Sequence, residues 1–102
     1  MNLKECDKMY VFDWDENKNL INQEKHGIDF TEASSVFFDE RAILFDDPEH
    51  SEDEERFILL GMSQNANVCM VCHCYREADT VIRIISARKA TRKELERYVR
   101  GI

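Results

Sequence analysis

The chain has 102 residues, of which 43% are apolar, and it holds three glycines and one proline. This length predicts one domain over residues 1–102, and the composition is typical of a compact folded protein. Apolar runs stay far below the ~20 residues that a membrane-spanning helix needs, and residues 1–8 lack the apolar core of a signal peptide. The sequence therefore predicts a cytoplasmic protein without a membrane partner.

The charges are distributed unevenly along the chain. The net charge is −7, which by itself argues against a nucleic-acid-binding protein. Residues 29–55 carry one basic residue against eleven acidic ones, whereas residues 56–102 carry nine against four. Because local fields steer ligands, the basic C-terminal half can attract phosphate groups while the acidic segment serves another purpose.

The N-terminal end of the chain predicts a strand and a capped helix. Residues 9–14 are rich in aromatic and β-branched side chains, a composition typical of a strand. A helix is predicted over residues 15–26 because an aspartate opens it and Gly27 follows it, where helices favour a left-handed residue. The apolar residues of this helix, Leu20 and Ile21, are expected on its inner side.

A second helix and an acidic loop follow. Asp29 and Glu32 have the spacing of a capping box, in which each side chain satisfies a backbone N–H of the first turn. The apolar residues of this short helix recur at helical spacing, at Phe30, Ala33, Val36 and Phe37. After a brief strand at residues 42–45, residues 46–55 hold the only proline and predict a solvated acidic loop.

The C-terminal half predicts three strands and a helix. The strands are joined by short polar links that predict hairpins, and they are expected over residues 56–63, 68–76 and 80–87. Thr91 and Glu94 form a second capping box, and Gly101 ends the helix that they open. The apolar stripe of this helix is Leu95, Tyr98 and Val99. The fold class is therefore α+β, a small antiparallel β-sheet with N-terminal helices and a C-terminal helix.

Three of the four cysteines, Cys69, Cys72 and Cys74, lie close together on one predicted strand. Alternation places Cys72 and Cys74 on one face of this strand, and Cys69 and His73 on the other. A zinc site needs four ligands that converge on one point, and no second Cys or His motif is present to complete one. Reduced core cysteines are favoured, with no metal and no cofactor expected, while a metal or redox site stays the alternative.

The stretch from Val81 to Glu94 joins an apolar strand to a cationic helix start. Arg83 stands among apolar residues, where a guanidinium is either paired with a carboxylate or directed into a cleft. Cations at a helix N-terminus oppose the helix dipole, so Arg88 and the basic residues after it suggest an anionic ligand. Strict alternation puts Arg83 and Arg88 on opposite faces, so the chain has to turn after Ala87 if both serve one site.

Two histidines have a functional and a structural interpretation. Lys25 and His26 close the first helix, where the pair could bind phosphate and move a proton. A favourable interaction between cations and the C-terminal end of the helix dipole is the simpler explanation. His73 could be a general base or a satisfied core histidine, and the second is more common.

An ordered set of motifs runs through most of the chain, from Phe12 to about Tyr98. They are F-D-W-D-E-N-K-N at 12–19, K-H-G-I-D-F-T-E-A at 25–33, V-F at 36–37, D-D-P-E-H-S at 46–51, E-R-F at 55–57 and I-R-I-I-S-A-R-K-A-T-R-K-E at 82–94. Each motif is ordinary, but the ordered set is specific. The sequence resembles the BrnT family of type II toxins.

The resemblance implies a fold similar to that of the RelE toxins and a metal-independent endoribonuclease that inhibits translation. It implies an RNA substrate, free or on the ribosome. It also implies a BrnA-like ribbon-helix-helix antitoxin that neutralises the toxin, and through which alone the toxin reaches operator DNA. In RelE-like nucleases the 2′-hydroxyl attacks the neighbouring phosphate, so the site needs a base, an acid and cations.

Motif position also implies roles for single residues. Phosphate and transition-state stabilisation would fall to Arg56, Arg83 and Arg88. His26 is the implied proton shuttle, with Lys25 or His73 as alternatives. The RNA backbone would be held by Lys25, Lys89, Arg92 and Lys93.

Two features depart from the family pattern, and two other functions stay open. The Cys-rich strand is particular to this chain, and the acidic run could repel RNA or meet a basic segment of the antitoxin.

One alternative function is a non-catalytic module that binds a DNA-binding antitoxin and co-represses its operon. The other is a small metal or redox protein built on the three cysteines. Clustered, accessible arginines favour the toxin, whereas dispersed or fully ion-paired arginines favour the module.

Overall fold

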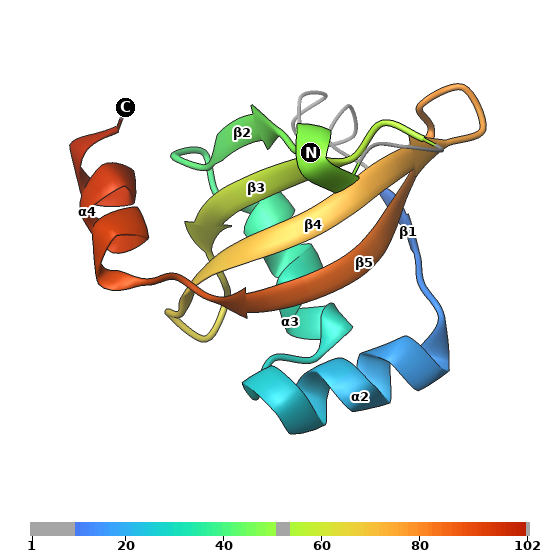
Figure 1. The fold of residues 1–102 in the computed structure, drawn as a ribbon, viewed down its shortest axis with the longest axis horizontal. Coiled ribbons are helices and arrows are strands. Elements are labelled where there is room, and N and C mark those ends of the chain that lie inside the picture. Colours follow the sequence, from blue (N-terminus) through green and yellow to red (C-terminus); the bar gives the residue numbers. More distant parts are fainter. Residues whose placement is uncertain (1–9, 51–53, 102) are drawn as a thin grey trace, which may run out of the picture.

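The computed structural model describes residues 10–50 and 54–101, which form a five-stranded sheet with helices (Figure 1). In chain order the elements are β1 (Val11–Asp13), α2 (Glu16–His26), α3 (Phe30–Ser35), the 3-10 helix η1 (Val36–Phe38), β2 (Ile43–Asp46), the 3-10 helix η2 (Pro48–His50), β3 (Phe57–Met62), β4 (Val68–Arg76), β5 (Val81–Lys89) and α4 (Arg92–Arg100). Within the described residues no helix is long and apolar enough to cross a membrane. The predicted α+β class is confirmed.

The strands lie in the order β1-β5-β4-β3-β2. From β2 to β5 each strand pairs antiparallel with the next, and the two predicted hairpins are confirmed. At the opposite edge β1 pairs with β5 in parallel, with Val11 opposite Val81 and Asp13 opposite Arg83. The expectation of a wholly antiparallel sheet is therefore wrong for β1. No hairpin joins β1 to its neighbour, so the geometry that enforces antiparallel pairing does not apply there.

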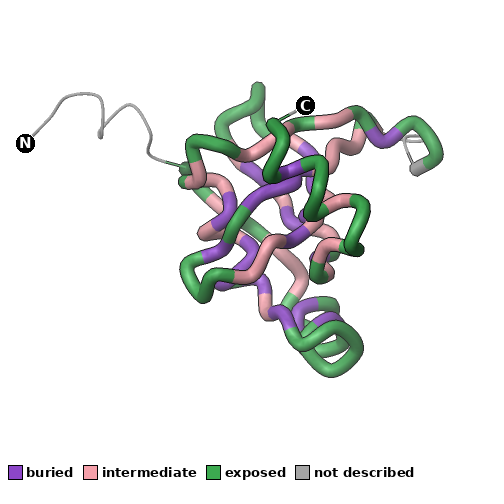
Figure 2. Tube along the Cα trace, turned by 90° about the vertical axis from the view of Figure 1, so that its left-hand side faces the viewer, coloured by how far each residue is buried: buried purple, intermediate pink, exposed green. Residues whose placement is uncertain are grey.

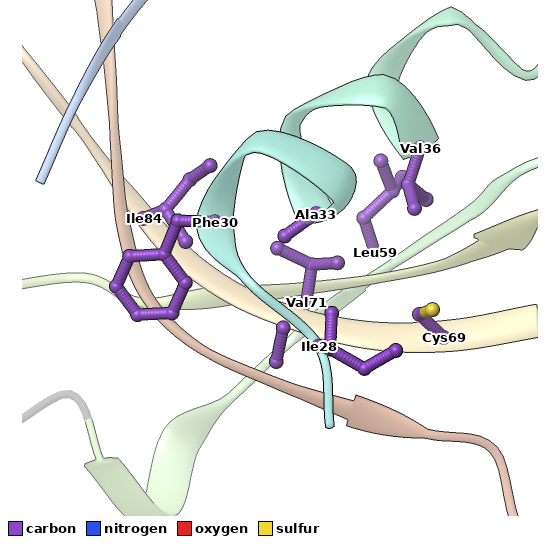
Figure 3. Close-up of a cluster of buried hydrophobic side chains, with 9 residues drawn as sticks. Ile28, Phe30, Ala33, Val36, Leu59, Cys69, Val71 and Ile84 are labelled. Carbon is purple, nitrogen blue, oxygen red and sulfur yellow. The ribbon is translucent and has the colours of Figure 1, made fainter. Parts of the chain in front are cut away.

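The hydrophobic core lies between one face of the sheet and the helical segment that contains α3 (Figure 3). The helical side contributes residues that are fully buried, namely Ile28, Phe30, Ala33 and Val36. The sheet contributes Leu59, Cys69, Val71, Ile84 and Ala87. The helical spacing of apolar residues in the sequence predicted Phe30, Ala33 and Val36, and that prediction is confirmed; Ile28 was not predicted. Phe37 packs against the edge of the cluster and is partly buried.

Side-chain caps define the ends of α2 and α4 as predicted. Asp15 accepts hydrogen bonds from two backbone N–H groups in the first turn of α2, and Gly27 ends that helix at a φ of 72°. Thr91 and Glu94 form the reciprocal capping box of α4. Because these caps satisfy backbone groups that a helix leaves unpaired, they fix where each helix begins and ends.

The capping box expected for α3 forms only in part. Asp29 accepts a hydrogen bond of 2.7 Å from the Glu32 N–H. The Glu32 carboxylate turns instead to the link between β3 and β4, where it accepts from the Ser63 hydroxyl at 2.6 Å and from Asn67 at 2.8 Å. Burial raises the pKa of Glu32, but the hydrogen bonds outweigh burial and lower the pKa overall. The two donors in this link explain why Glu32 does not complete the box.

The inner face of α2 is polar rather than apolar. Leu20 and Ile21, which the sequence placed inside, are 56% and 59% exposed, whereas Asn19 and Asn22 are buried. Figure 2 shows most of this helix, at the bottom of the view, as exposed. The expectation for Leu20 and Ile21 is wrong because the helix packs against backbone polar groups, which need hydrogen-bond partners when they are buried.

β5 contains a bulge at the middle of its pairing with β4. Cys72 lies opposite Ser86, but the next residue of β4, His73, lies opposite Ile84. Ile85 is therefore the extra residue on β5. A bulge of this kind breaks the strict alternation of side chains between the two faces of a sheet.

The bulge determines which side chains of β5 share a face. Ile84 and Ala87 both face the core, at 1% exposure. They lie three positions apart, so strict alternation would put them on opposite faces. Arg83, Ser86 and Arg88 consequently share the opposite face. The expectation that Arg83 and Arg88 face opposite ways is therefore wrong, and no turn after Ala87 is needed.

α4 stands beside one end of the sheet (Figure 1). Tyr98 is buried, and its hydroxyl donates a hydrogen bond of 2.6 Å to Asp39. Leu95 and Val99, the other members of the predicted apolar stripe, are 42% and 73% exposed. The predicted stripe is therefore buried at Tyr98 only, and its two other members are exposed.

Candidate active site

A cleft of about 330 Å³ lies over the face of the sheet that is turned away from the core. Its floor is formed by side chains of β3, β4 and β5, and its rim by the segment after β2 and the end of α2. The lining residues are His26, Asp47, Glu49, Arg56, Ile58, Met70, Cys72, Ile85, Ser86, Ala87 and Arg88. The cleft thus contains three of the four residues that motif position assigned to catalysis.

His26 reaches the cleft from the last turn of α2. Gly27 adopts the left-handed conformation directly after it, and this ends the helix at the rim. The histidine is exposed to solvent. It therefore supplies an accessible imidazole, a group that can accept or donate a proton near neutral pH.

Arg88 lies at the end of β5 and is held by the N-terminal turn of α4. Its two terminal nitrogens donate to the two carboxylate oxygens of Glu94 at 2.8 and 2.9 Å. The same glutamate accepts a hydrogen bond from the Thr91 N–H at 2.8 Å. The hydrogen bonds from Arg88 lower the pKa of Glu94 to about 2. The carboxylate is therefore charged at neutral pH and fixes the plane of the guanidinium.

Arg56 enters the cleft just before β3, opposite the segment after β2. The Asp47 N–H donates a hydrogen bond of 2.9 Å to the Arg56 carbonyl, which closes the base of this loop. Asp47 is 7% exposed, so the expectation of a wholly solvated acidic loop is wrong at that residue. Asp47 and Arg56 both line the cleft.

The thiol of Cys72 lies in the cleft beside Asp47, to which it donates at 3.8 Å. Burial, and then the charge of Asp47, raises the pKa of Cys72 to about 11. The group is therefore a neutral thiol at physiological pH, and a neutral thiol is a poor nucleophile and metal ligand. Cys72 contributes shape and polarity to the cleft rather than reactivity.

Arg83 stands apart from the cleft. It lies on the same face of β5 but forms an ion pair with Asp13, its neighbour on β1. Its side chain is 29% exposed. Of the two alternatives that the sequence left open for this arginine, the structure shows the carboxylate pair.

The fold and the cleft can be compared with known proteins. A sequence model of the ribonuclease toxin BrnT of type II toxin–antitoxin systems matches residues 14–94. The chain belongs to the BrnT family. No curated protein sequence matches the chain significantly.

One solved structure that resembles the chain is the 1.1 Å crystal structure of the Brucella abortus ribonuclease toxin BrnT. The TM-score is 0.63 at 23% sequence identity, and the match covers 82% of this chain and 100% of that chain. At this identity the likeness establishes the fold. The family match establishes the class, a ribonuclease toxin of a type II toxin–antitoxin system, which implies an antitoxin partner.

The four residues that BrnT membership assigned to the RNA backbone lie in separate places. Lys25 is exposed beside His26 at the end of α2, and Arg92 and Lys93 are exposed in the first turn of α4. Lys89 alternates away from Arg88, and its charge acts on Glu32 and Cys69 on the core side. The four cations come from three elements, α2, β5 and α4, and none of them is among the residues that line the cleft.

The two other cysteines of β4 and His73 belong to the interior of this BrnT-family fold. Cys69, Cys74 and His73 are 0–1% exposed. The His73 ring lies 3.1 Å from the Val71 carbonyl and 3.3 Å from the Tyr75 hydroxyl, and burial lowers its pKa. His73 is therefore a core histidine. In the described residues no three Cys, His, Asp or Glu side chains are grouped to hold a metal ion.

Sequence reasoning missed several residues of the cleft. Asp47 and Glu49 were assigned to a solvated loop, yet both line the cleft with Arg56. Ser86 was not singled out, although alternation alone places it on the same face of β5 as Arg88. The one available indication for Asp47 was its place directly after a strand end, where a loop returns to the sheet.

Proposed function

We propose that this BrnT-family chain is an endoribonuclease that cleaves RNA without a metal ion and inhibits translation, and whose fold is RelE-like. The observation that carries the proposal is the cleft shared by His26, Arg56 and Arg88. Cleavage by attack of a 2′-hydroxyl needs a proton carrier and fixed positive charge beside the phosphate. One histidine and two arginines supply these functions.

In the proposed reaction, the 2′-oxygen forms a bond to phosphorus and the bond from phosphorus to the 5′-oxygen breaks. His26 takes the proton of the 2′-hydroxyl or delivers one to the leaving oxygen. Arg56 and Arg88 stabilise the negative charge that accumulates on the pentavalent phosphorane. Asp47 and Glu49 lie in the same cleft and supply carboxylates that can carry the second proton.

The contact between Arg88 and Glu94 supports a role for Arg88 as a fixed cation. A guanidinium has five N–H donors, and the bonds to Glu94 and to the Lys89 carbonyl engage three of them. The side chain is 43% exposed, so its other donors can meet a phosphate. Glu94 thus orients the guanidinium before the substrate arrives, and preorganised charge stabilises a transition state more than mobile charge does.

Arg83, Lys25, Lys89, Arg92 and Lys93 complete the proposal. Arg83 was assigned to catalysis by motif position, and its pair with Asp13 has to open or reorient for that role. The four other cations are proposed to bind the RNA backbone, which attracts them without regard to sequence.

The partner that we propose is a BrnA-like ribbon-helix-helix antitoxin, through which the toxin reaches operator DNA. The acidic residues between β2 and β3 are proposed to meet a basic segment of that antitoxin. Of this run, Ser51, Glu52 and Asp53 lie outside the described residues. Three described acidic residues of the run at 46–55 lie outside the cleft, namely Asp46, Glu54 and Glu55. Neutralising these three together should weaken antitoxin binding at low salt. Unchanged binding would contradict this contact.

A second candidate function is a non-catalytic module that binds the antitoxin and co-represses the operon. The ion pairs of Arg83 with Asp13 and of Arg88 with Glu94 favour it, because arginines held by carboxylates can serve structure alone. Expression in a bacterium separates the two candidates. The toxin proposal predicts growth arrest that the adjacent antitoxin gene relieves.

Matched variants sharpen that experiment. Arg88→Ala is expected to abolish growth arrest, whereas Arg76→Ala, which removes an exposed arginine paired with Glu54 outside the cleft, should not. Arg83→Ala tests the assignment of that residue. Absence of arrest by the unaltered protein, at levels matched by immunoblot, would favour the module.

A further inference from the structure

Asn22 joins α2 to the strand that carries Arg88. Its side chain is 6% exposed, on the inner face of the helix. The amide nitrogen donates to the carbonyl oxygens of Ile28 and Ala87, both at 2.8 Å, and the amide oxygen accepts from the Ala87 N–H at 3.1 Å. One side chain therefore satisfies both backbone polar groups of Ala87.

Ala87 needs such a partner because of where β1 ends. β1 pairs with β5 from Val81 to Arg83. Beyond Arg83, the outer edge of β5 faces no strand among residues 10–50 and 54–101. An asparagine amide offers a donor and an acceptor side by side, as a peptide group does. Asn22 takes the place of the missing strand residue opposite Ala87.

This contact lies directly behind two proposed catalytic groups. Residues four apart on a helix share a face, so Asn22 and His26 point to the same side of α2. Ala87 immediately precedes Arg88 in the sequence, and Ala87, Arg88 and His26 all line the cleft. The hydrogen bonds of Asn22 therefore connect the helix end that carries the histidine to the strand that carries the arginine.

From this geometry we infer that Asn22 is a positioning residue of the cleft, which fixes the place of His26 relative to Arg88. The inference rests on the proposed function, because it bears on cleavage only where these two groups act on one phosphate. Asn22 acts through the backbone of Ala87 and through α2, and its buried side chain does not enter the cleft.

Asn19 offers a matched control on the same helix. It is 8% exposed, it accepts a hydrogen bond of 2.7 Å from the Phe30 N–H, and it donates to Glu16 at 3.0 Å. These bonds stay within the corner between α2 and α3 and do not reach β5. Losing Asn19 therefore weakens the fold while leaving His26 tied to Arg88.

The test is steady-state cleavage of a fluorescein-labelled, single-stranded RNA of mixed sequence, measured together with melting temperatures. For Asn22→Ala we expect kcat to fall by about 10- to 100-fold with KM within about threefold, since a ~1 Å misplacement of reacting groups costs this much. Asn19→Ala is expected to keep a kcat near that of the unaltered protein at a similar loss of melting temperature. Equal kcat values for the two variants would overturn the inference.

Asn22→Gln covers the case in which Asn22→Ala does not fold. The longer amide keeps both polar groups but displaces α2 from β5 by up to about 1.5 Å, the length of one carbon–carbon bond. We expect a folded protein with a lowered kcat. A folded Asn22→Gln variant with full kcat would contradict a positioning role.

Two further measurements separate this inference from the proposed function. Full cleavage rates in His26→Ala and Arg88→Ala would contradict the proposed site. Loss of activity in both of these variants, with full activity in Asn22→Ala, would contradict the inference alone. The contact itself is measured without RNA by amide hydrogen exchange. The Ala87 N–H should exchange slowly in the unaltered protein and in Asn19→Ala, and fast in Asn22→Ala. Slow exchange in Asn22→Ala would show that Asn22 does not hold Ala87.

Discussion

The two faces of the sheet are built from the same strands but have different roles. On the core face, Val71, Ile84 and Ala87 are at most 1% exposed and lie under the helical segment with α3. On the other face, Arg56 and Arg88 are only partly buried and line an open cleft. The difference shows that a single bulged residue of β5 decides which of the side chains after it face the core and which face the cleft.

The largest expected effect contrasts Ile84 with its neighbour Ile85, the extra residue of the bulge. Ile84 is 1% exposed in the core, whereas Ile85 is half-buried and lines the cleft. Ile84→Ala should lower the free energy of unfolding by about 2–5 kcal/mol, because it leaves a cavity that the core fills only in part. Ile85→Ala should cost about 1 kcal/mol, since it removes less buried apolar area. Urea denaturation measures both, and equal losses would contradict the assignment of faces.

A smaller effect is expected where the core face leaves no room. A methyl group at Gly61 would lie 2.8 Å from the Ala42 Cβ and 2.9 Å from the Val36 Cγ1. Gly61→Ala should therefore destabilise the fold by about 1–3 kcal/mol through overpacking. Because Val36→Ala removes one of the clashing atoms, the double variant should lose less stability than the sum of the two single losses. Additive losses would show that the overlap is relieved elsewhere.

The smallest stability effect lies on the cleft side, and it depends on pH. The folded-state pKa of Glu94 is about 2 against an ordinary 4.5, so its stabilising effect is fully present above pH 4.5 and is lost as the pH falls toward 2. Glu94→Gln keeps a capping side chain but removes the charge, and should cost on the order of 1 kcal/mol at neutral pH. The difference in unfolding free energy between the two proteins should vanish near pH 2. A difference that is constant with pH would mean that the ion pair contributes nothing.

Much of the fold is predictable from the sequence because local chemistry determines it. Asp15, Thr91 and the two glycines after α2 and α4 set the helix ends through backbone hydrogen bonds that involve only nearby residues. The three C-terminal strands follow from their composition and short polar links. The parallel pairing of β1 and the polar inner face of α2 depend on residues far apart in the chain, and periodicity alone does not reveal them.

The candidate site is predictable only in part, for the same reason. Motif position named His26, Arg56 and Arg88, which the structure places in one cleft, and Arg83, which it places beside Asp13. The carboxylates of the cleft, and the bulge that puts Arg83 on the same face as Ser86 and Arg88, require the tertiary fold. Asn22 escaped notice because an asparagine on a helix is ordinarily a solvated residue, and its buried role appears only when the edge of β5 is known.

The central claim, that the cleft cleaves RNA, is tested most directly by cleavage of labelled RNA by the purified protein in EDTA. Products with 2′,3′-cyclic phosphate ends are expected. His26→Ala, Arg56→Ala and Arg88→Ala should each lower the rate by roughly 10²–10³-fold, by analogy with loss of a proton carrier or a transition-state donor. Arg76→Ala should cleave at the unaltered rate. Cleavage that EDTA abolishes, or that all three cleft variants retain in full, would contradict the account.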